Sequence, residues 1–340
     1  MAHQSWNRNA AAGGASPSWA SGGAARRGDQ AADNKNCKRK VVEKLVLDIG
    51  DPDLRENALH ELSKKRYQLR YLPSLLWSSF GTIAVLLQEI VSIYPTLSPP
   101  NLALAQSNKV CNALVLLQRV ASHPETRVSL VNACIPLYLY PFLSTTSKAR
   151  SFEHLRLTSL SVIRTLVKVD DTAVICFLLS TEAIPPLLCA MENGFELSKS
   201  AAISILQRIL LNDVGLERIC ASPVQFFAVN RVLGNMVGAL TLQPSSQLLE
   251  CIIGCYLRLS DNEMGLKVLR NSLPDMLKDG TFNNSLREDP TTRRCLQKLL
   301  YNIQGPLLPL QGGRKIWTYA GHQNWTQCNQ HLSTIVGFPV

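Results

Sequence analysis

The sequence reads LLQRV at residues 116–120, VIRTL at 162–166, ILQRI at 205–209 and YLRL at 256–259, and these four stretches decide the fold that we predict. Each places an arginine inside a run of large apolar residues, and the arginines lie 45, 44 and 50 positions apart. Repeated units of 40–47 residues, each made of two or three helices, are typical of armadillo and HEAT repeats. The sequence therefore predicts an all-α, armadillo/HEAT-like, right-handed helical-repeat solenoid of about six repeats. An irregular helical bundle is the alternative.

Helix signals fill the sequence between the arginine stretches. A break near Pro124, Asp170 or Asp261 follows three of the arginine stretches, and we expect Asp261 to cap the next helix. Further Pro-containing stretches, 135–137, 184–187 and 273–274, begin the next segments. No stretch combines sustained strand alternation with hairpin signals, so we expect almost no strands.

Two helices near the beginning are predicted in more detail. Asp51 is expected to cap a helix with Pro52 in its first turn. The buried face of that helix is predicted to comprise Leu54, Ala58, Leu59 and Leu62. A further helix is expected from Pro73 to about Ile93.

The net charge is unevenly distributed along the chain. The protein has 340 residues, 46% of them hydrophobic, and a formal net charge of +10. Residues 1–40 carry seven Lys or Arg and two Asp, and residues 306–340 carry two basic residues and no acid, which leaves +3 for residues 41–305. We expect a disordered basic N-terminal tail at 1–37, an armadillo-like repeat domain at 38–305 and an unstructured C-terminal tail at 306–340.

Composition and motifs argue against several classes of protein. We expect no signal peptide and no membrane span, and ten cysteines without a CxxC pair suggest a reducing compartment. The sequence contains no GxSxG, GxxxxGK[ST] or HExxH motif, so we expect no enzyme, no catalytic residue and no cofactor. Weak metal-binding candidates are the pair Cys251 and Cys255 and the tail group His322, Cys328 and His331; we expect no metal site.

The recurring arginines Arg119, Arg164, Arg208 and Arg258 have two interpretations. They form a basic stripe along a groove, or each is a structural residue whose stem packs and whose guanidinium caps a helix or pairs with an acid. We favour the structural interpretation because each arginine lies beside large apolar residues.

Longer strings resemble a known family. They are RENALHELSKKR at 55–66, WSSFGTIA at 77–84, QSNKVCNAL at 106–114, ASHPETR at 121–127, LRLTSL at 155–160 and CYLRLSDN at 255–262. These strings resemble the required-for-cell-differentiation family, and the resemblance spans about residues 40–304. Members of that family are the armadillo-type subunit of the carbon catabolite repression–NOT (CCR-NOT) mRNA deadenylase complex.

The resemblance implies a non-catalytic scaffold or adaptor. Such a protein docks on the NOT scaffold subunit and recruits tryptophan-bearing regulators in mRNA decay and translational repression. The implied tryptophan-binding positions are Ser78, Phe80, Ala84, Ser161 and Ser200. The implied scaffold-binding positions are His154 and Ala201. Each of these seven residues has an alternative role as an ordinary packed helix residue.

The resemblance also bears on an alternative to the adaptor role, which is nucleic-acid binding. Some family members carry arginines linked to nucleic-acid binding, where this chain has Gln225, Gln247 and Met264. The loss of these charges weakens the alternative function, a nucleic-acid-binding transcriptional regulator. Further expectations are weak nucleic-acid binding through the basic tails, a homodimer, and a cytoplasmic and nuclear location. A less favoured hypothesis places a tail tryptophan (Trp6, Trp19, Trp317 or Trp325) in a family pocket.

Overall fold

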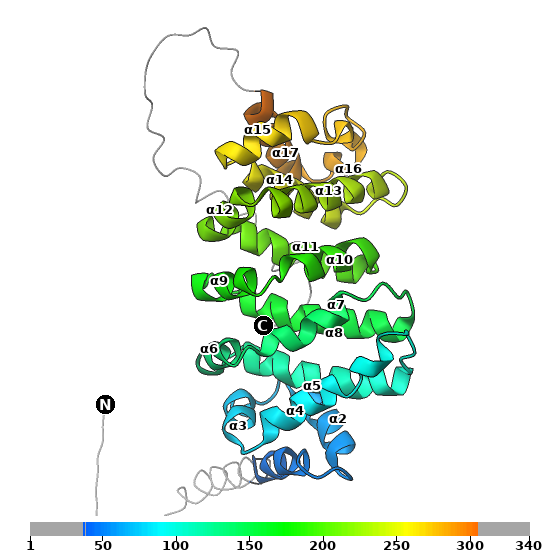
Figure 1. The fold of residues 1–340 in the computed structure, drawn as a ribbon, viewed down its shortest axis with the longest axis vertical. Helices are drawn as coiled ribbons and strands as arrows, with labels where there is room; N and C mark the ends of the chain where they lie inside the picture. Colours follow the sequence, from blue (N-terminus) through cyan, green and yellow to red (C-terminus); the bar gives the residue numbers. More distant parts are fainter. Residues whose placement is uncertain (1–36, 38, 305–340) are drawn as a thin grey trace, which may run out of the picture.

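Three helices recur in a fixed order along the chain (Figure 1). The structure is a computed structural model that describes residue 37 and residues 39–304, and this part contains no strand. The first helices of the successive units are α3 (Leu72–Ser78), α6 (Pro124–Asn132), α9 (Thr172–Ser180), α12 (Asp213–Ala221) and α15 (Glu263–Ser272). The second positions hold α4 (Thr82–Val91), η2 (Ile135–Leu139) with α7 (Tyr140–Leu143), α10 (Ile184–Asn193), α13 (Pro223–Leu240), and η3 (Asp275–Leu277) with α16 (Asn283–Arg287).

The third helix of each unit forms the inner layer. These helices are α5 (Leu104–Ala121), α8 (Arg150–Val167), α11 (Glu196–Leu211), α14 (Ser246–Leu259) and α17 (Pro290–Gln304). A helix over residues 39–48 and α2 (Arg55–Lys65) precede the five units, and η1 (Tyr94–Thr96) lies between α4 and α5. Five units and this incomplete first one agree with the predicted all-α solenoid of about six repeats.

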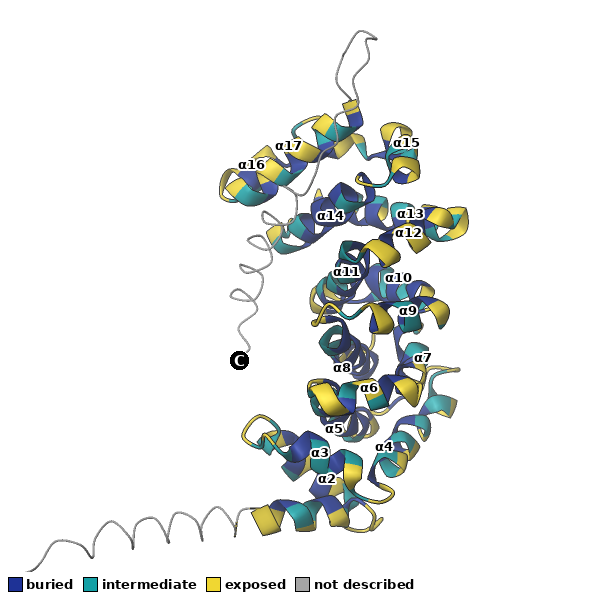
Figure 2. Cartoon of the chain, turned by 90° about the vertical axis from the view of Figure 1, so that its left-hand side faces the viewer, coloured by how far each residue is buried: buried dark blue, intermediate teal, exposed yellow. Residues whose placement is uncertain are grey.

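Equivalent helices stack in rows. In the inner row α2 packs on α5, α5 on α8, α8 on α11, α11 on α14 and α14 on α17. The first helices make a second row, in which α12 contacts both α9 and α15, and the second helices make a third, in which α10 contacts both α7 and α13. Figure 2 shows the stack bowed, with α8 and α11 on its inner side and α10 and α13 on its outer side.

Prolines and buried apolar residues explain why the chain folds in this way. A proline occupies the first turn of α6, η2, α10, α13 and α17, where its missing N–H costs no helical hydrogen bond. Apolar side chains from every row then form one core along the stack, with Leu160, Ile205 and Ile252 fully buried in the inner row. No unit can bury its apolar face alone, so the stack itself provides the core.

Some local predictions were wrong. The helix expected over residues 73–93 is two helices, α3 and α4, separated by residues 79–81. Asp51 caps only a turn, by accepting a hydrogen bond from the backbone N–H of Asp53, and α2 begins at Arg55. Leu54 is 46% exposed and lies off the buried face. The cap of α15 is Asn262 and not Asp261.

The described residues contain no single helix that is long and apolar enough to span a membrane. Two helix pairs meet the length and composition criteria only jointly, and both are sharply bent, by 88° within residues 72–96 and by 82° within residues 172–193. Of the two predicted tails, only residue 37 is described, and it is helical; residues 1–36 and 306–340 lie outside the described residues.

Candidate partner-binding surfaces

The corner between α3 and α4 presents Phe80 to solvent. Gly81, at the N-terminus of α4, has φ of +73°, a left-handed conformation that side-chain-bearing residues rarely adopt. The Ser79 hydroxyl donates to the Leu75 carbonyl at 2.7 Å and closes the end of α3. The relative exposure of Phe80, between these two residues, is 105%. An aromatic ring held outside the core by a fixed backbone turn is suited to burial against a partner.

Ser78 and Ala84 flank this ring. Ser78 is the last residue of α3 and Ala84 lies in the first turn of α4, and both are exposed. The Ser78 hydroxyl donates to the Leu75 carbonyl at 3.4 Å, the same carbonyl that accepts from Ser79. The structure therefore brings the first three predicted site residues, Ser78, Phe80 and Ala84, to one exposed corner.

The other predicted site residues lie on two neighbouring inner helices. Ser161 and His154 are seven residues apart on α8, which places them on the same side of that helix. Ser200 lies on α11, which packs against α8. Both serines are partly buried, and the Ser161 hydroxyl donates to the Leu157 carbonyl at 2.9 Å. The structure therefore places these two serines on adjacent, packed helices of the inner row.

The two predicted scaffold-binding residues differ in their exposure. His154 is exposed, whereas Ala201 is only 3% exposed and has little side-chain surface to offer a partner. The surrounding protein removes part of the water around the imidazole, although the residue is exposed, and this lowers the pKa of His154; the nearby Arg150 charge lowers it further. The imidazole is therefore held toward its neutral form, which is easier to desolvate in an interface than the charged form.

Two exposed leucines at the N-terminal ends of inner helices were not predicted. Leu104 is the first residue of α5 and is 49% exposed, and Leu197 is the second residue of α11 and is 67% exposed. His154 lies between them in the row, near the start of α8. The available signal was an apolar residue in the first turn of a helix, outside the spacing of its buried face.

The structural interpretation of the recurring arginines is confirmed most clearly at Arg258. Each of the four arginines lies in the last turn of an inner helix, where a cation interacts favourably with the helix dipole. Arg258 Nε donates to the Leu210 carbonyl at 2.9 Å, and its guanidinium pairs with Asp213 and Asp261. Arg208 is partly buried, which lowers its pKa, while Asp170 opposes that shift.

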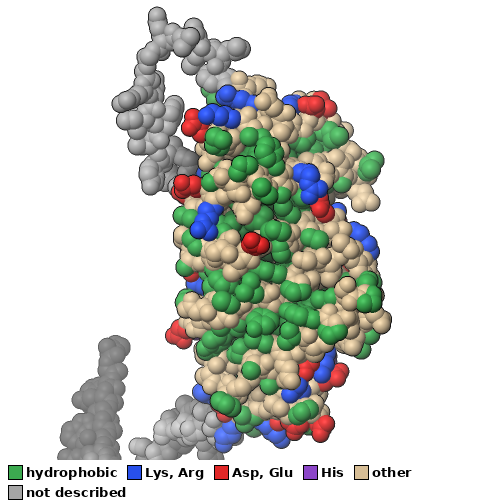
Figure 3. Space-filling model, in the orientation of Figure 1, with side chains coloured by type: hydrophobic (Ala, Val, Ile, Leu, Met, Phe, Trp, Pro, Cys, Tyr) green, Lys and Arg blue, Asp and Glu red, His purple; other side chains and the backbone are tan. Residues whose placement is uncertain are grey.

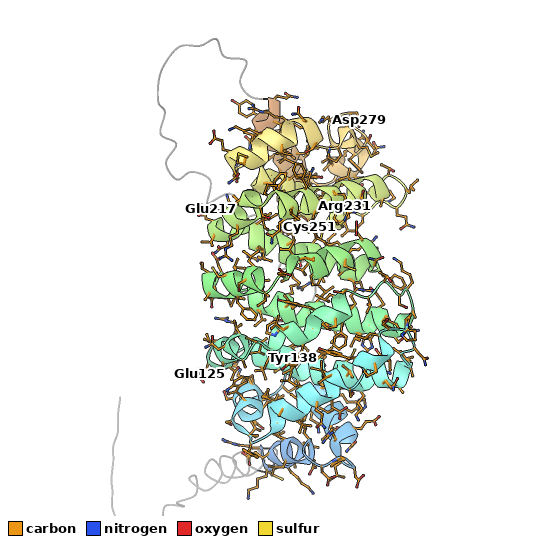
Figure 4. All side chains as sticks on the ribbon, in the orientation of Figure 1. Glu125, Tyr138, Glu217, Arg231, Cys251 and Asp279 are labelled. Carbon is orange, nitrogen blue, oxygen red and sulfur yellow. The ribbon has the colours of Figure 1, made fainter. Side chains whose placement is uncertain are left out.

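Acidic residues lie in the row of first helices. Figure 4 places Glu125, on α6, and Glu217, on α12, at one side of the molecule, in the row of first helices. In Figure 3 apolar side chains cover much of the middle of the visible face, and most charged ones lie nearer its edges and ends. The visible face, on which α10 and α13 lie, is therefore mixed in charge and carries no continuous basic stripe.

The three positions considered for nucleic-acid binding, Gln225, Gln247 and Met264, carry no cation. Gln225 and Gln247 are partly buried near the starts of α13 and α14, and the Gln225 N–H donates to the Ser222 hydroxyl as part of the α13 cap. Met264 is 59% exposed near the start of α15. These residues offer no charge to neutralise phosphates.

Several thiols are buried. Burial raises the pKa of Cys111 to about 11 and that of Cys251 to about 12, and it raises the pKa of Cys255 as well. Cys251 and Cys255 lie one turn apart in α14, inside the core. No group of three or more His, Cys, Asp or Glu in the described part of the chain is arranged to hold a metal ion. His322, Cys328 and His331 lie outside the described residues.

Solved structures with a similar fold are armadillo repeat proteins. The designed armadillo repeat protein YIII(Dq)4CqI superposes with a TM-score of 0.57 at 14% identity, over 77% of this chain and 99% of its own. A second design, YIII(Dq.V1)4CPAF in complex with the peptide (KR)4, superposes with a TM-score of 0.53 at 15% identity, over the same shares of the two chains. At these identities the similarity shows the fold alone.

Sequence relatives are much more similar. The cell differentiation protein rcd1 of Schizosaccharomyces pombe is 51% identical over 271 residues, 80% of this chain and 96% of the relative. The protein CAF40 of Saccharomyces cerevisiae is 54% identical over 250 residues, 73% of this chain and 67% of the relative. Residues 45–303 match the cell differentiation family, Rcd1-like. This chain belongs to the Rcd1-like cell differentiation family.

Proposed function

We propose that this chain is a non-catalytic adaptor subunit of the CCR-NOT mRNA deadenylase complex. It docks on the NOT scaffold subunit and recruits tryptophan- or motif-bearing regulators in mRNA decay and translational repression. Membership of the Rcd1-like family and the armadillo fold support this role. Repeat solenoids present extended surfaces to partners, as a binding subunit requires.

One observation carries the proposal: large apolar side chains at or beside helix ends are exposed, although residues 39–304 bury most of their other large apolar side chains. Phe80 is fully exposed, and Leu104 and Leu197 are about half or more exposed at the starts of inner helices. Burying one such side chain in an interface contributes about 1.5–3 kcal/mol, so a few of them suffice for specific docking.

We assign the two kinds of partner to different surfaces. Regulators with a tryptophan use the corner formed by Ser78, Phe80 and Ala84 and the surface of α8 and α11 at Ser161 and Ser200. The NOT scaffold subunit uses the surface around His154, with Ala201 as a buried support beneath it. A tryptophan ring suits a small contact surface on helices because one side chain buries a large apolar area.

A binding experiment with two partners tests this assignment. The full chain is titrated with the purified helical docking region of the NOT scaffold subunit and, separately, with a tryptophan-containing peptide. Phe80→Ala is expected to weaken peptide binding by about tenfold or more and to leave scaffold binding unchanged. His154→Glu is expected to do the reverse.

Phe227→Ala provides the matched control. Phe227 is 55% exposed on α13, away from both assigned surfaces, so its loss should change neither affinity. The adaptor role is wrong if the unmodified chain fails to bind the scaffold region. The assignment of surfaces is wrong if Phe80→Ala and Phe227→Ala behave alike.

A further inference from the structure

A groove opens in the last described repeat, between η3, α16 and α17. Its floor consists of four buried apolar side chains, those of Leu277, Phe282, Leu286 and Leu296. These residues come from three elements that meet around the turn at Gly280, which has φ of +83°. In Figure 4 Asp279, the residue before this glycine, marks the turn beside α16. The groove is remote in sequence from the α3–α4 corner and from the starts of α8 and α11.

The groove has room for one large apolar side chain. Its volume is about 160 Å³. An apolar cavity of ~150 Å³ is large enough to bind benzene in another protein. Leu300 is partly exposed at its wall, so an incoming side chain would meet apolar surface there and at the floor.

The rim of the groove is polar and carries only positive charge. The exposed side chains that line it include Lys278, Arg293 and Gln297, and no Asp or Glu lines it. Helix α17 adds two further cations, Arg294 and Lys298, and contains no acid. Within residues 39–304, no salt bridge engages these three α17 cations.

Most nearby acids are already engaged by their own neighbours. Asp275 pairs with Lys278 at 2.9 Å, and Asp279 accepts from the Thr281 N–H at 2.9 Å. Asp289 accepts from the first backbone N–H groups of α17 at 3.0 Å. Asp279 and Asp289 keep their negative charge, since a backbone N–H is neutral, and Lys278 is already paired with Asp275. The positive charge available to a ligand is therefore that of Arg293, Arg294 and Lys298, none of which forms an ion pair within residues 39–304.

We propose that this groove binds a short acidic peptide of a partner protein, with a leucine or phenylalanine seated on the apolar floor and its flanking carboxylates on Arg293 and the other cations of α17. This inference is independent of scaffold docking because it concerns a separate surface. An apolar floor favours a peptide over nucleic acid, whose binding rests mainly on phosphate charge.

Fluorescence anisotropy with the full chain tests the proposal. The probe is a labelled peptide of the sequence Glu-Asp-Glu-Leu-Leu-Phe-Asp-Glu-Asp. Arg293→Glu is expected to reverse the attraction to the carboxylates, and Gln297→Trp to fill the groove from its exposed rim. Each change should weaken binding by about tenfold or more. A control peptide with Ser-Gly-Ser at its centre should lose affinity to a similar degree.

Arg218→Glu is the matched control, because Arg218 is exposed on α12 and its reversal changes the net charge equally. It should alter the affinity by less than about twofold, and thermal unfolding should show that every variant is folded. Equal binding by all variants, or no binding by the unmodified chain, overturns the proposal.

Three other occupants of the groove give distinct results, and each overturns the proposal. A ten-nucleotide oligouridylate that binds more tightly than the peptide and depends on Arg293 identifies a nucleic-acid site. A dimer in sedimentation that Gln297→Trp dissociates identifies a second copy of this chain. Faster hydrogen exchange in residues 305–340 of Gln297→Trp, without peptide binding, identifies a segment of the same chain.

Discussion

Arg258 joins two repeats through one guanidinium. Its Nε donates to the Leu210 carbonyl at the end of α11, and its other nitrogens pair with Asp213 and Asp261. Arg258→Ala removes these bonds and leaves the carbonyl without its partner, so we expect it to lower the free energy of unfolding by about 2 kcal/mol. Urea denaturation measures this change. Arg218→Ala, at an exposed site, should cost less than about 0.5 kcal/mol, and equal effects would show that Arg258 has no joining role.

At the level of elements, Gly215 and Gly265 allow the end of one inner helix to lie very close to the first helix of the next repeat. A Cβ on Gly215 in α12 would lie 2.0 Å from the Ile209 carbonyl oxygen, and one on Gly265 in α15 would lie 2.3 Å from the Leu259 carbonyl oxygen. We expect Gly215→Ala to destabilise the fold by about 2 kcal/mol or more, because backbone must move. Gly238→Ala, with no neighbour within 4 Å inside α13, should instead be neutral or stabilising, as thermal unfolding would show. If Gly215→Ala and Gly238→Ala lowered the stability equally, close packing at Gly215 would be excluded as the cause.

Sequence periodicity was sufficient to predict the helical repeats, but less so the joints within them. The arginine spacing and the prolines result from the same stacking that buries the core, so the sequence alone predicts the repeats. The sequence predicts Gly81 inside one helix, because an isolated glycine is tolerated in a helix. Its positive φ is imposed by the path of the chain between α3 and α4, which the local sequence does not reveal. The exposure of Leu197 and the burial of Ala201 depend equally on which side of α11 meets α8, and no local pattern fixes that.

At the scale of the whole molecule, stability should vary along the stack. In the described part, α8 is covered by α5 and α11, whereas α17 has one inner-row neighbour, α14. Stability in such proteins is roughly a sum over repeats and their interfaces, so an end repeat opens more easily than a central one. Hydrogen exchange of the full chain should therefore be slower in α8 than in α17. Equal protection in both helices would mean that the stack unfolds as one cooperative unit.

The joints at α12 and α15 share one local design, with Asn212 and Asn262 each accepting a hydrogen bond from the glycine N–H three residues later. Residues 212–261 thus form a cassette with matching ends. Excising this cassette would reconnect the chain at a junction of the same kind, and inserting it twice would lengthen the solenoid. The length of such a solenoid can therefore change by whole repeats, in evolution or by engineering, while the junction between repeats stays the same.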